Sequence, residues 1–295
     1  MPGPLRVATR GSALARWQAG RVADLLGVDA ELVVVTTSGD RRTDVPIHAM
    51  GGTGVFVKEV EEALLDGRAD VAVHSAKDLP SDLPDGLVLA AVPERADPRD
   101  VLVGRSLADL PTGGRVGTGS VRRRAQLAHE RPDLTFGELR GNVPTRVSRV
   151  GELDAVVVAL AALERLGLRD RVAEVLPTAV MLPQVGQGAL AVEARSEDER
   201  VLELVARADH GPSRVAVTAE RAFLAELGGG CALPCGALAT VAGGEVSIEV
   251  LLASLDGRLA LRARAAGEDP ALVGREAARV LVEEHGGRLL LEGAG

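Results

Sequence analysis

The feature that most constrains the fold of this 295-residue chain is a regular alternation of short apolar runs with amphipathic helical patterns. Residues 5–9, 31–36 and 69–73 are rich in β-formers and predict strands. Helical patterns at residues 12–26 and 55–65 separate these strands. Strands that alternate with helices of this length form βαβ units around a parallel sheet. We therefore predict an α/β fold.

The same alternation returns after a polar break at residues 96–100. Residues 115–117, 134–139 and 154–160 predict strands, and a helical pattern opens at Ser120. A further strand is expected at residues 189–193, after a loop that contains Pro183, Gly186 and Gly188. These elements predict a second α/β unit. Ligands of such sheets bind at the carboxyl ends of the strands, in the cleft between the two halves.

Aromatic residues are scarce, with three Phe, one Trp and no Tyr, so the cores must be built from Val, Leu and Ala. Such residues suit buried parallel strands covered by helices. In the first predicted helix, which Ser12 would cap, we expect the core positions to be Leu14, Trp17, Val22 and Leu25.

The last third of the chain changes character. A helix at residues 213–227 stops at three glycines, and alternating runs follow that are joined by Asp256-Gly257, a hairpin signature. Residues 270–284 are again helical, which together predicts a small α+β domain. We expect three domains: residues 1–94 with 190–208, residues 99–187, and residues 212–295.

Charge and composition exclude several classes of function. A formal net charge of −8 argues against nucleic acid as a partner, although a local arginine cluster can still hold a small anion. No apolar run approaches the roughly 20 residues that span a bilayer, and no signal peptide is readable. We expect a cytoplasmic protein with reduced cysteines and no membrane partner. The five histidines are scattered, so a metal site is unsupported.

Polar clusters follow two of the predicted strands. Residues 9–12 and 117–123 each end a strand and open a helix, where free backbone N–H groups favour an anion. Arg122, Arg123 and Arg140 (together with Arg146) would make this cleft rich in guanidinium groups. The alternative is that they are solvated arginines in an arginine-rich chain, and the pattern alone does not decide.

Two further positions carry chemical interest. Lys77-Asp78 follows a buried strand, where a carboxylate could handle protons, although an ordinary surface ion pair is the alternative. Cys231 follows three glycines on a loop whose backbone can approach a ligand, although a small buried side chain is the usual role of a cysteine.

Taken in order, these clusters match one family. The segments are VATRGS (7–12), WQA (17–19), GVFVKE (54–59), HSAKDLP (74–80), DPRD (97–100), GTGSVRR (117–123), LRGNV (139–143), QVGQGA (184–189) and GGGCALPCG (228–236). With them the chain resembles the porphobilinogen deaminase family over nearly its whole length. The resemblance implies two doubly wound domains like type II periplasmic binding proteins, and a small α+β C-terminal domain.

The resemblance also implies an activity and a cofactor. Family members join four porphobilinogen units head to tail into hydroxymethylbilane and release ammonia, in tetrapyrrole (haem) biosynthesis. Their dipyrromethane primer is held covalently by a thioether at the position of Cys231, while Cys235 would be structural. Asp78 matches the catalytic aspartate. A monomer is expected.

Site residues carry over from the family by position. The cofactor-binding positions correspond to Lys77, Asp78, Ser120, Arg122, Arg123 and Arg146. The substrate-binding positions correspond to Arg10, Ser12, Gln18, Arg140 and Arg165.

One departure from the family concerns the glycine-rich turn, which we expect to act as a mobile lid. Ala49 and Thr53 stand where relatives often have lysines, although Gly51, Gly52 and Gly54 would keep the turn flexible.

Two other functions explain part of the pattern. An anion-binding or effector-sensing module would explain the arginines, but not a cysteine on a glycine loop or Lys-Asp at a strand end. A phosphoryl-transfer enzyme is disfavoured, because the chain has no glycine-rich phosphate loop that ends in Lys-Ser/Thr.

Overall fold

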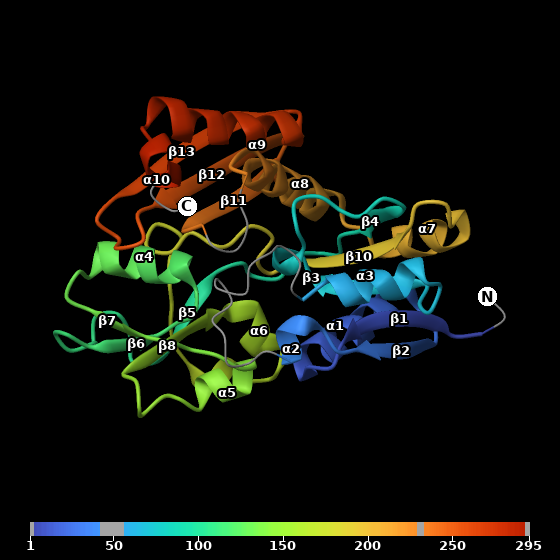
Figure 1. Cartoon of the computed structure of the whole chain (residues 1–295), viewed down its shortest axis with the longest axis horizontal. Coiled ribbons are helices and arrows are strands. Elements are labelled where there is room, and N and C mark those ends of the chain that lie inside the picture. Colours follow the sequence, from blue (N-terminus) through green and yellow to red (C-terminus); the bar gives the residue numbers. More distant parts are fainter. Residues whose placement is uncertain (1–2, 42–55, 229–232, 293–295) are drawn as a thin grey trace.

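The computed structural model describes residues 3–41, 56–228 and 233–292, and in this part of the chain it contains three β-sheets (Figure 1). The strand orders are β2-β1-β3-β10-β4, β7-β6-β8-β5-β9 and β11-β12-β13. The first two sheets are mixed and covered by helices, whereas the third is a small antiparallel sheet. The predicted fold class is therefore confirmed.

The first domain is built on β1 (Leu5–Arg10), β2 (Ala30–Val35), β3 (Val71–Ser75), β4 (Leu87–Ala91) and β10 (Leu190–Arg195). β1 runs parallel to β2 and β3, and β10 returns antiparallel between β3 and β4. The helices of this domain are α1 (Ala13–Leu26), α2 (Ser38–Arg41), α3 (Lys58–Leu65), η2 (Ala76–Asp78), α7 (Glu199–Val205) and η4 (Ala206–Ala208). Apolar residues of α1 and α7 share one core on the sheet, and those of α3 share another.

The second domain contains β5 (Asp100–Gly104), β6 (Arg115–Gly117), β7 (Thr135–Gly137), β8 (Ala155–Ala159) and β9 (Val172–Val175). Its helices are α4 (Val121–Glu130), α5 (Val143–Val147), α6 (Leu160–Arg165) and η3 (Arg169–Arg171). Every residue of β8 is buried, because helices cover both faces of this central strand.

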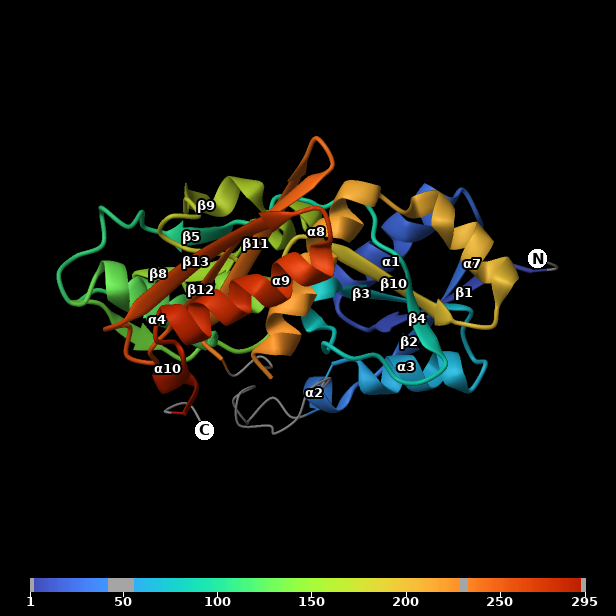
Figure 2. The same cartoon turned by 90° about the horizontal axis from the view of Figure 1, so that it is seen from above.

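The third domain contains β11 (Cys235–Ala242), β12 (Glu245–Ala253) and β13 (Ala260–Gly267). Its helices are α8 (Gly211–Glu226), α9 (Pro270–Arg279), η5 (Val280–Glu284) and α10 (Arg288–Glu292). α8 and α9 pack closely at Gly274, where a Cβ atom would overlap the carbonyl oxygen of Ala219. In Figure 1 and Figure 2 the third sheet lies over the second domain, beside α4.

All three domains meet at one buried carboxylate. Glu220 of α8 accepts hydrogen bonds from Nη1 and Nη2 of Arg95 at 2.6 and 3.2 Å. It also accepts from the backbone N–H groups of Gly186 at 2.7 Å and Ala239 at 2.9 Å. Arg95 and Gly186 belong to the two segments that connect the first and second domains, so Glu220 fixes the third domain to both connections.

Some sequence expectations need correction. In α1, Trp17 and Leu25 are 41% and 39% exposed, and Val22 is the one expected core position that is fully buried, while Leu14 is only partly so. The buried face instead contains several alanines, which let the helix lie close to the sheet. The third strand runs two residues later than expected, so His74 and Ser75 lie within it.

The remaining element boundaries agree in part with the patterns. The hairpin expected at Asp256-Gly257 joins β12 to β13. The helix expected at 55–65 begins at Lys58, and residue 55 lies outside the described residues. The patterns do not predict strands β4, β5, β9 and β11. Among the described residues, no helix is both long and apolar enough to cross a membrane.

Candidate active site

Asp78 stands at the carboxyl end of β3, on the short 3₁₀ turn η2. The turn is fixed from two sides. The backbone N–H of Ala76 donates to the carbonyl of Ala189 at 3.0 Å, and Nε2 of Gln18 donates to Oγ of Ser75 at 2.8 Å. A half-buried carboxylate is therefore held at the edge of the sheet where ligands of such folds bind.

Lys77, the preceding residue, is half-buried, and its ammonium group is directed into the protein. Its Nζ donates to Oε1 of Gln187 at 3.4 Å, beyond the usual hydrogen-bond length. Burial and the charge of Arg123 lower the pKa of Lys77 to about 8, while Asp78 and Asp100 oppose the change. An ammonium group in this position would gain from an additional anionic partner.

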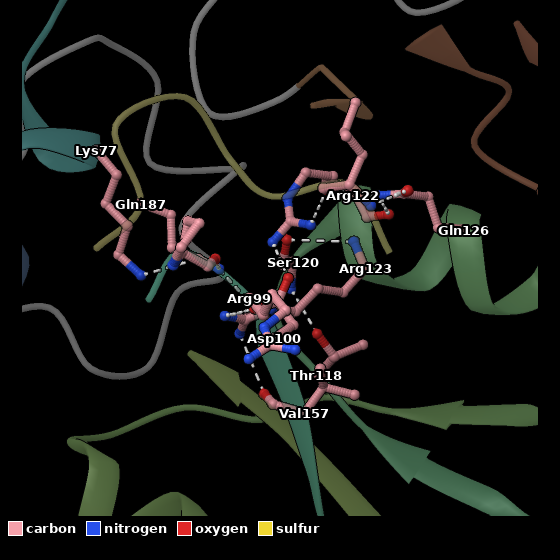
Figure 3. Close-up of polar contacts among 12 residues, drawn as sticks. Lys77, Arg99, Asp100, Thr118, Ser120, Arg122, Arg123, Gln126, Val157 and Gln187 are labelled. Carbon is pink, nitrogen blue, oxygen red and sulfur yellow. Dashed lines mark hydrogen bonds and ion pairs between the residues drawn. The ribbon is translucent and has the colours of Figure 1, made fainter. Parts of the chain in front are cut away.

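Arg122 and Arg123 open helix α4, and their side chains point inward rather than to solvent, with 3% and 6% exposure. Both pair with Asp100, the fully buried first residue of β5 (Figure 3). Nη2 of Arg122 donates to Oδ2 at 2.7 Å, whereas Nε and Nη2 of Arg123 donate to Oδ1 at 3.0 and 2.8 Å. These two arginines are not solvated surface residues.

The helix that carries them begins after Ser120, whose Oγ accepts a hydrogen bond from the backbone N–H of Arg123 at 3.4 Å. The helix therefore opens at Ser120 as predicted, and Ser120 is its N-cap. The N–H of Ser120 itself donates to Oγ1 of Thr118 at 3.1 Å. Ser12 caps α1 in the same manner, since its Oγ accepts from the N–H of Ala15 at 3.2 Å.

Arg146, on α5, joins this group of charges. Burial lowers its pKa to about 10, and the positive charges of Arg123, Arg140 and Arg10 lower it as well, while Asp78 raises it. Predicted cations of both domains therefore lie close enough to act on one another and on the predicted catalytic carboxylate. Nε of Arg146 donates to the carbonyl of Gly141 at 2.8 Å, which fixes the direction of the side chain.

Arg10 and Arg165 make aromatic contacts. The guanidinium of Arg10 lies 4.1 Å from the centre of the Phe56 ring. That of Arg165 lies 5.6 Å from the centre of the Trp17 ring, and its Nη2 donates to the carbonyl of Gly188 at 2.6 Å. Burial lowers the pKa of Arg165 to about 10. Arg165 thus holds α6 of the second domain against α1 of the first.

The residues present fit a ligand with several carboxylates. Neighbouring positive charges lower the pKa values of Lys77 and Arg146. A bound carboxylate would therefore stabilise the protonated form of both side chains. Nε of Arg122 is buried and has no hydrogen-bond partner in the described part of the chain, whereas its Nη1 and Nη2 are both engaged. A buried guanidinium N–H without an acceptor is costly, and a carboxylate would satisfy it.

The predicted attachment residue, Cys231, lies outside the described residues. The glycine-rich turn lies outside them as well, with Ala49, Gly51, Gly52, Thr53 and Gly54. Cys235 is buried at the start of β11.

The sequence patterns do not point to Asp100 and Gln187 as site residues. Residues 96–100 have the composition of a polar break, although the apolar run that follows Asp100 marks the start of a buried strand. A carboxylate is almost never fully buried unless it is paired, so an Asp that begins such a strand would need a cationic partner.

Two family models match most of the chain. The family model "Porphobilinogen deaminase, dipyromethane cofactor binding domain" matches residues 5–203, and "Porphobilinogen deaminase, C-terminal domain" matches residues 215–283. The porphobilinogen deaminase of Syntrophomonas wolfei is 48% identical, with 98% of each chain covered. That of Moorella thermoacetica is 49% identical, covering 98% of this chain and 96% of its own.

Solved structures similar to the chain include a putative periplasmic sulfonate-binding protein from Methylobacillus flagellatus, with 16% identity and a TM-score of 0.37. The match covers 74% of this chain and 66% of that one. The two family models together extend over most of the sequence, and relatives of nearly the same length match almost all of it. The chain therefore belongs to the porphobilinogen deaminase family.

Proposed function

We propose that this chain joins four porphobilinogen molecules head to tail into hydroxymethylbilane and releases ammonia at each coupling, as a transferase of tetrapyrrole biosynthesis. One observation carries the proposal beyond family membership. Asp78 lies at a strand end near buried cations of two domains, where a pyrrole with two carboxylate side chains finds both a carboxylate and guanidinium groups.

The family model names a dipyrromethane cofactor. In this chain Cys231 would hold it covalently, and its carboxylates would be bound by Lys77, Ser120, Arg122, Arg123 and Arg146. When bound, the cofactor supplies a pyrrole α-carbon as the nucleophile that starts the chain. The unpartnered Nε–H of Arg122 and the depressed pKa of Lys77 support this assignment.

Asp78 is the catalytic residue in this proposal. Its carboxylate oxygens can accept hydrogen bonds from pyrrole N–H groups and stabilise the positive charge that develops when ammonia leaves. The same oxygens can take up the proton that each coupling releases. The 3₁₀ turn is held by Ala189 and, through Ser75, by Gln18, so these oxygens have a fixed support.

Substrate carboxylates would be bound by Arg10, Ser12, Gln18, Arg140 and Arg165. Arg10 ends β1 and Ser12 caps α1, where the helix dipole also favours an anion. Gln18 of α1 donates to Ser75 at the β3 turn, and Arg165 of α6 lies over the ring of Trp17 on α1.

The three sheets support three proposed domains, residues 1–94 with 190–208, residues 99–187 and residues 212–295, because each would contain one sheet. Family membership supports two further proposals, that the protein acts as a monomer and that it is cytoplasmic.

The direct test is to add porphobilinogen and measure both ammonia release and substrate consumption. Asp78→Asn is expected to lower turnover by about 10²- to 10⁴-fold, the usual contribution of a general acid–base group. Asp85→Asn, at an exposed carboxylate on the following loop, is the matched control and should retain activity. Wild-type protein that binds porphobilinogen without releasing ammonia would instead be an anion-binding module.

A further inference from the structure

Asp100 binds two of the proposed cofactor-binding cations at once. Its Oδ2 accepts from Arg122, and its Oδ1 accepts twice from Arg123 (Figure 3). Burial alone would raise the pKa of Asp100, but the two arginine charges outweigh burial and hold the pKa at about 2. Asp100 is therefore ionised near neutral pH, and it fixes both guanidinium groups by charge as well as by direction.

Gln187 extends this network to the first domain. Its Nε2 donates to Oδ1 of Asp100 at 2.9 Å and to the carbonyl of Pro98 at 2.7 Å, while its Oε1 accepts from Lys77. Its own carbonyl accepts from Nε of Arg95 at 2.8 Å. Gln187 is fully buried and lies in the connection that returns to the first domain, so it joins both connections to the anion-binding side chains.

We propose that Asp100 and Gln187 are positioning residues that hold Lys77, Arg122 and Arg123 in the arrangement that binds the cofactor carboxylates. The inference rests on the proposed function and adds two residues to its machinery. Neither residue needs to touch the cofactor, since each acts through the cations that it orients.

The contacts of both guanidinium groups fix their directions as well as neutralise their charge. Nε of Arg122 is buried and has no hydrogen-bond partner in the described part of the chain. Nη1 donates to the carbonyl of Leu182 and Nη2 to Asp100, so the direction of Nε is set by two fixed contacts. The direction of the Arg123 guanidinium is also fixed, because its Nη1 donates to the carbonyl of Val157 at 3.1 Å.

The network also controls the charge on Lys77. The groups that act on its ammonium are Asp78 on its own turn, Arg122 and Arg123 on α4, and Asp100 on β5. Burial and the two arginines lower the pKa of Lys77 to about 8, whereas the two carboxylates oppose the change. Removing the charge of Asp100 would lower that pKa further, so Lys77 would lose its proton at lower pH.

The test uses Asp100→Asn and Gln187→Met, both close in size to the native side chains. Glu249→Gln is the matched control, because Glu249 is also one carboxylate shared between two arginines, Arg262 and Arg264, but within the third domain. Three quantities are measured for each purified protein. They are the fraction that carries the cofactor mass, the midpoint of the alkaline limb of porphobilinogen consumption, and the melting temperature.

Both test variants are expected to carry less cofactor and to lose activity by about 10- to 100-fold as the cations are misplaced. Asp100→Asn should also show an alkaline midpoint at lower pH than the wild type. The control should match the wild type in cofactor content and midpoint. Variants that lose melting temperature but keep wild-type cofactor content and midpoint would overturn the inference and leave Asp100 a structural ion pair.

If Asp100→Asn does not fold, Gln187→Met decides alone by its cofactor content and its activity. Failure of the proposed function is a separate result, since then the wild type would itself carry no cofactor and consume no porphobilinogen.

Discussion

Nε2 of His74 lies 2.9 Å from Oε2 of Glu193 inside the first domain, with both side chains buried. His74 is on β3 and Glu193 on the neighbouring β10. Neither of these atoms makes a hydrogen bond in the described part of the chain, so the two groups lie close together without hydrogen-bond geometry. Glu61 of α3 completes the cluster. Burial raises its pKa to about 7, Glu193 raises it as well, and His74 opposes the rise.

This cluster predicts that stability depends on pH and that Glu61→Gln removes most of the dependence. The native state keeps the Glu61 proton up to a pKa of about 7, whereas the unfolded chain loses it near 4.5. The stabilisation is therefore present below the lower value and lost as the pH rises through the upper one. Between about pH 5 and about pH 8, the wild type should lose on the order of 2 kcal/mol relative to the variant.

Urea unfolding at the two pH values measures this difference in the free energy of unfolding. Glu62→Gln, at an exposed neighbour on the same helix, is the control and should behave as the wild type. Parallel pH profiles for the wild type and Glu61→Gln would contradict the assignment.

Glu220 predicts a second stability effect, at the junction of the domains. Glu220→Gln leaves the largely buried Arg95 guanidinium without its charge partner, and one amide NH₂ would face backbone N–H donors. Breaking a buried ion pair in this manner costs about 3–5 kcal/mol. The measured free energy of unfolding should fall accordingly, whereas Glu276→Gln, in an exposed pair with Arg279, should leave it nearly unchanged. A Glu220 variant as stable as the wild type would show that the junction does not depend on this carboxylate.

The fluorescence of Trp17 can test whether Arg165 binds substrate. It is the one tryptophan of the chain, and the Arg165 guanidinium lies over its ring. If Arg165 turns from the ring to a substrate carboxylate, Trp17 emission should change when porphobilinogen is added. In Arg165→Leu the same addition should leave the emission unchanged. An equal response in both proteins would separate Arg165 from substrate binding.

Much of the fold could be predicted from sequence because local patterns determine it. The β-branched run Val156, Val157 and Val158 lies between turn and helix signals, and it becomes part of the buried central strand β8. Helix starts are equally local. Ser12 caps its helix as predicted and the helix predicted to open at Ser120 does so, because each serine side chain bonds to an N–H only three residues along the chain.

The features that could not be predicted depend on tertiary context. Trp17 is expected in the core because it is large and apolar, but its ring faces Arg165 of another domain. β5 begins at Asp100, which the sequence pattern assigns to a polar loop. Asp100 can be buried in the strand because Arg122 and Arg123 of α4 pair with it.

The candidate site also contains residues that could be predicted from local motifs and residues that could not. Lys77, Asp78 and the arginines could be named from motifs, and the charges of Arg10, Arg123 and Arg140 all act on Arg146 in the structure. The link from Asp100 through Gln187 to Lys77 joins positions that are 87 and 110 residues apart along the chain, which no local pattern encodes.

The most direct test of the central proposal is the intact mass of freshly purified wild-type protein beside Cys231→Ser and Cys235→Ser. We expect the wild type and the Cys235 variant to carry the added mass of a dipyrromethane, and the Cys231 variant to lack it. A wild type without added mass that also fails to react with porphobilinogen would contradict the account and favour an anion-binding module.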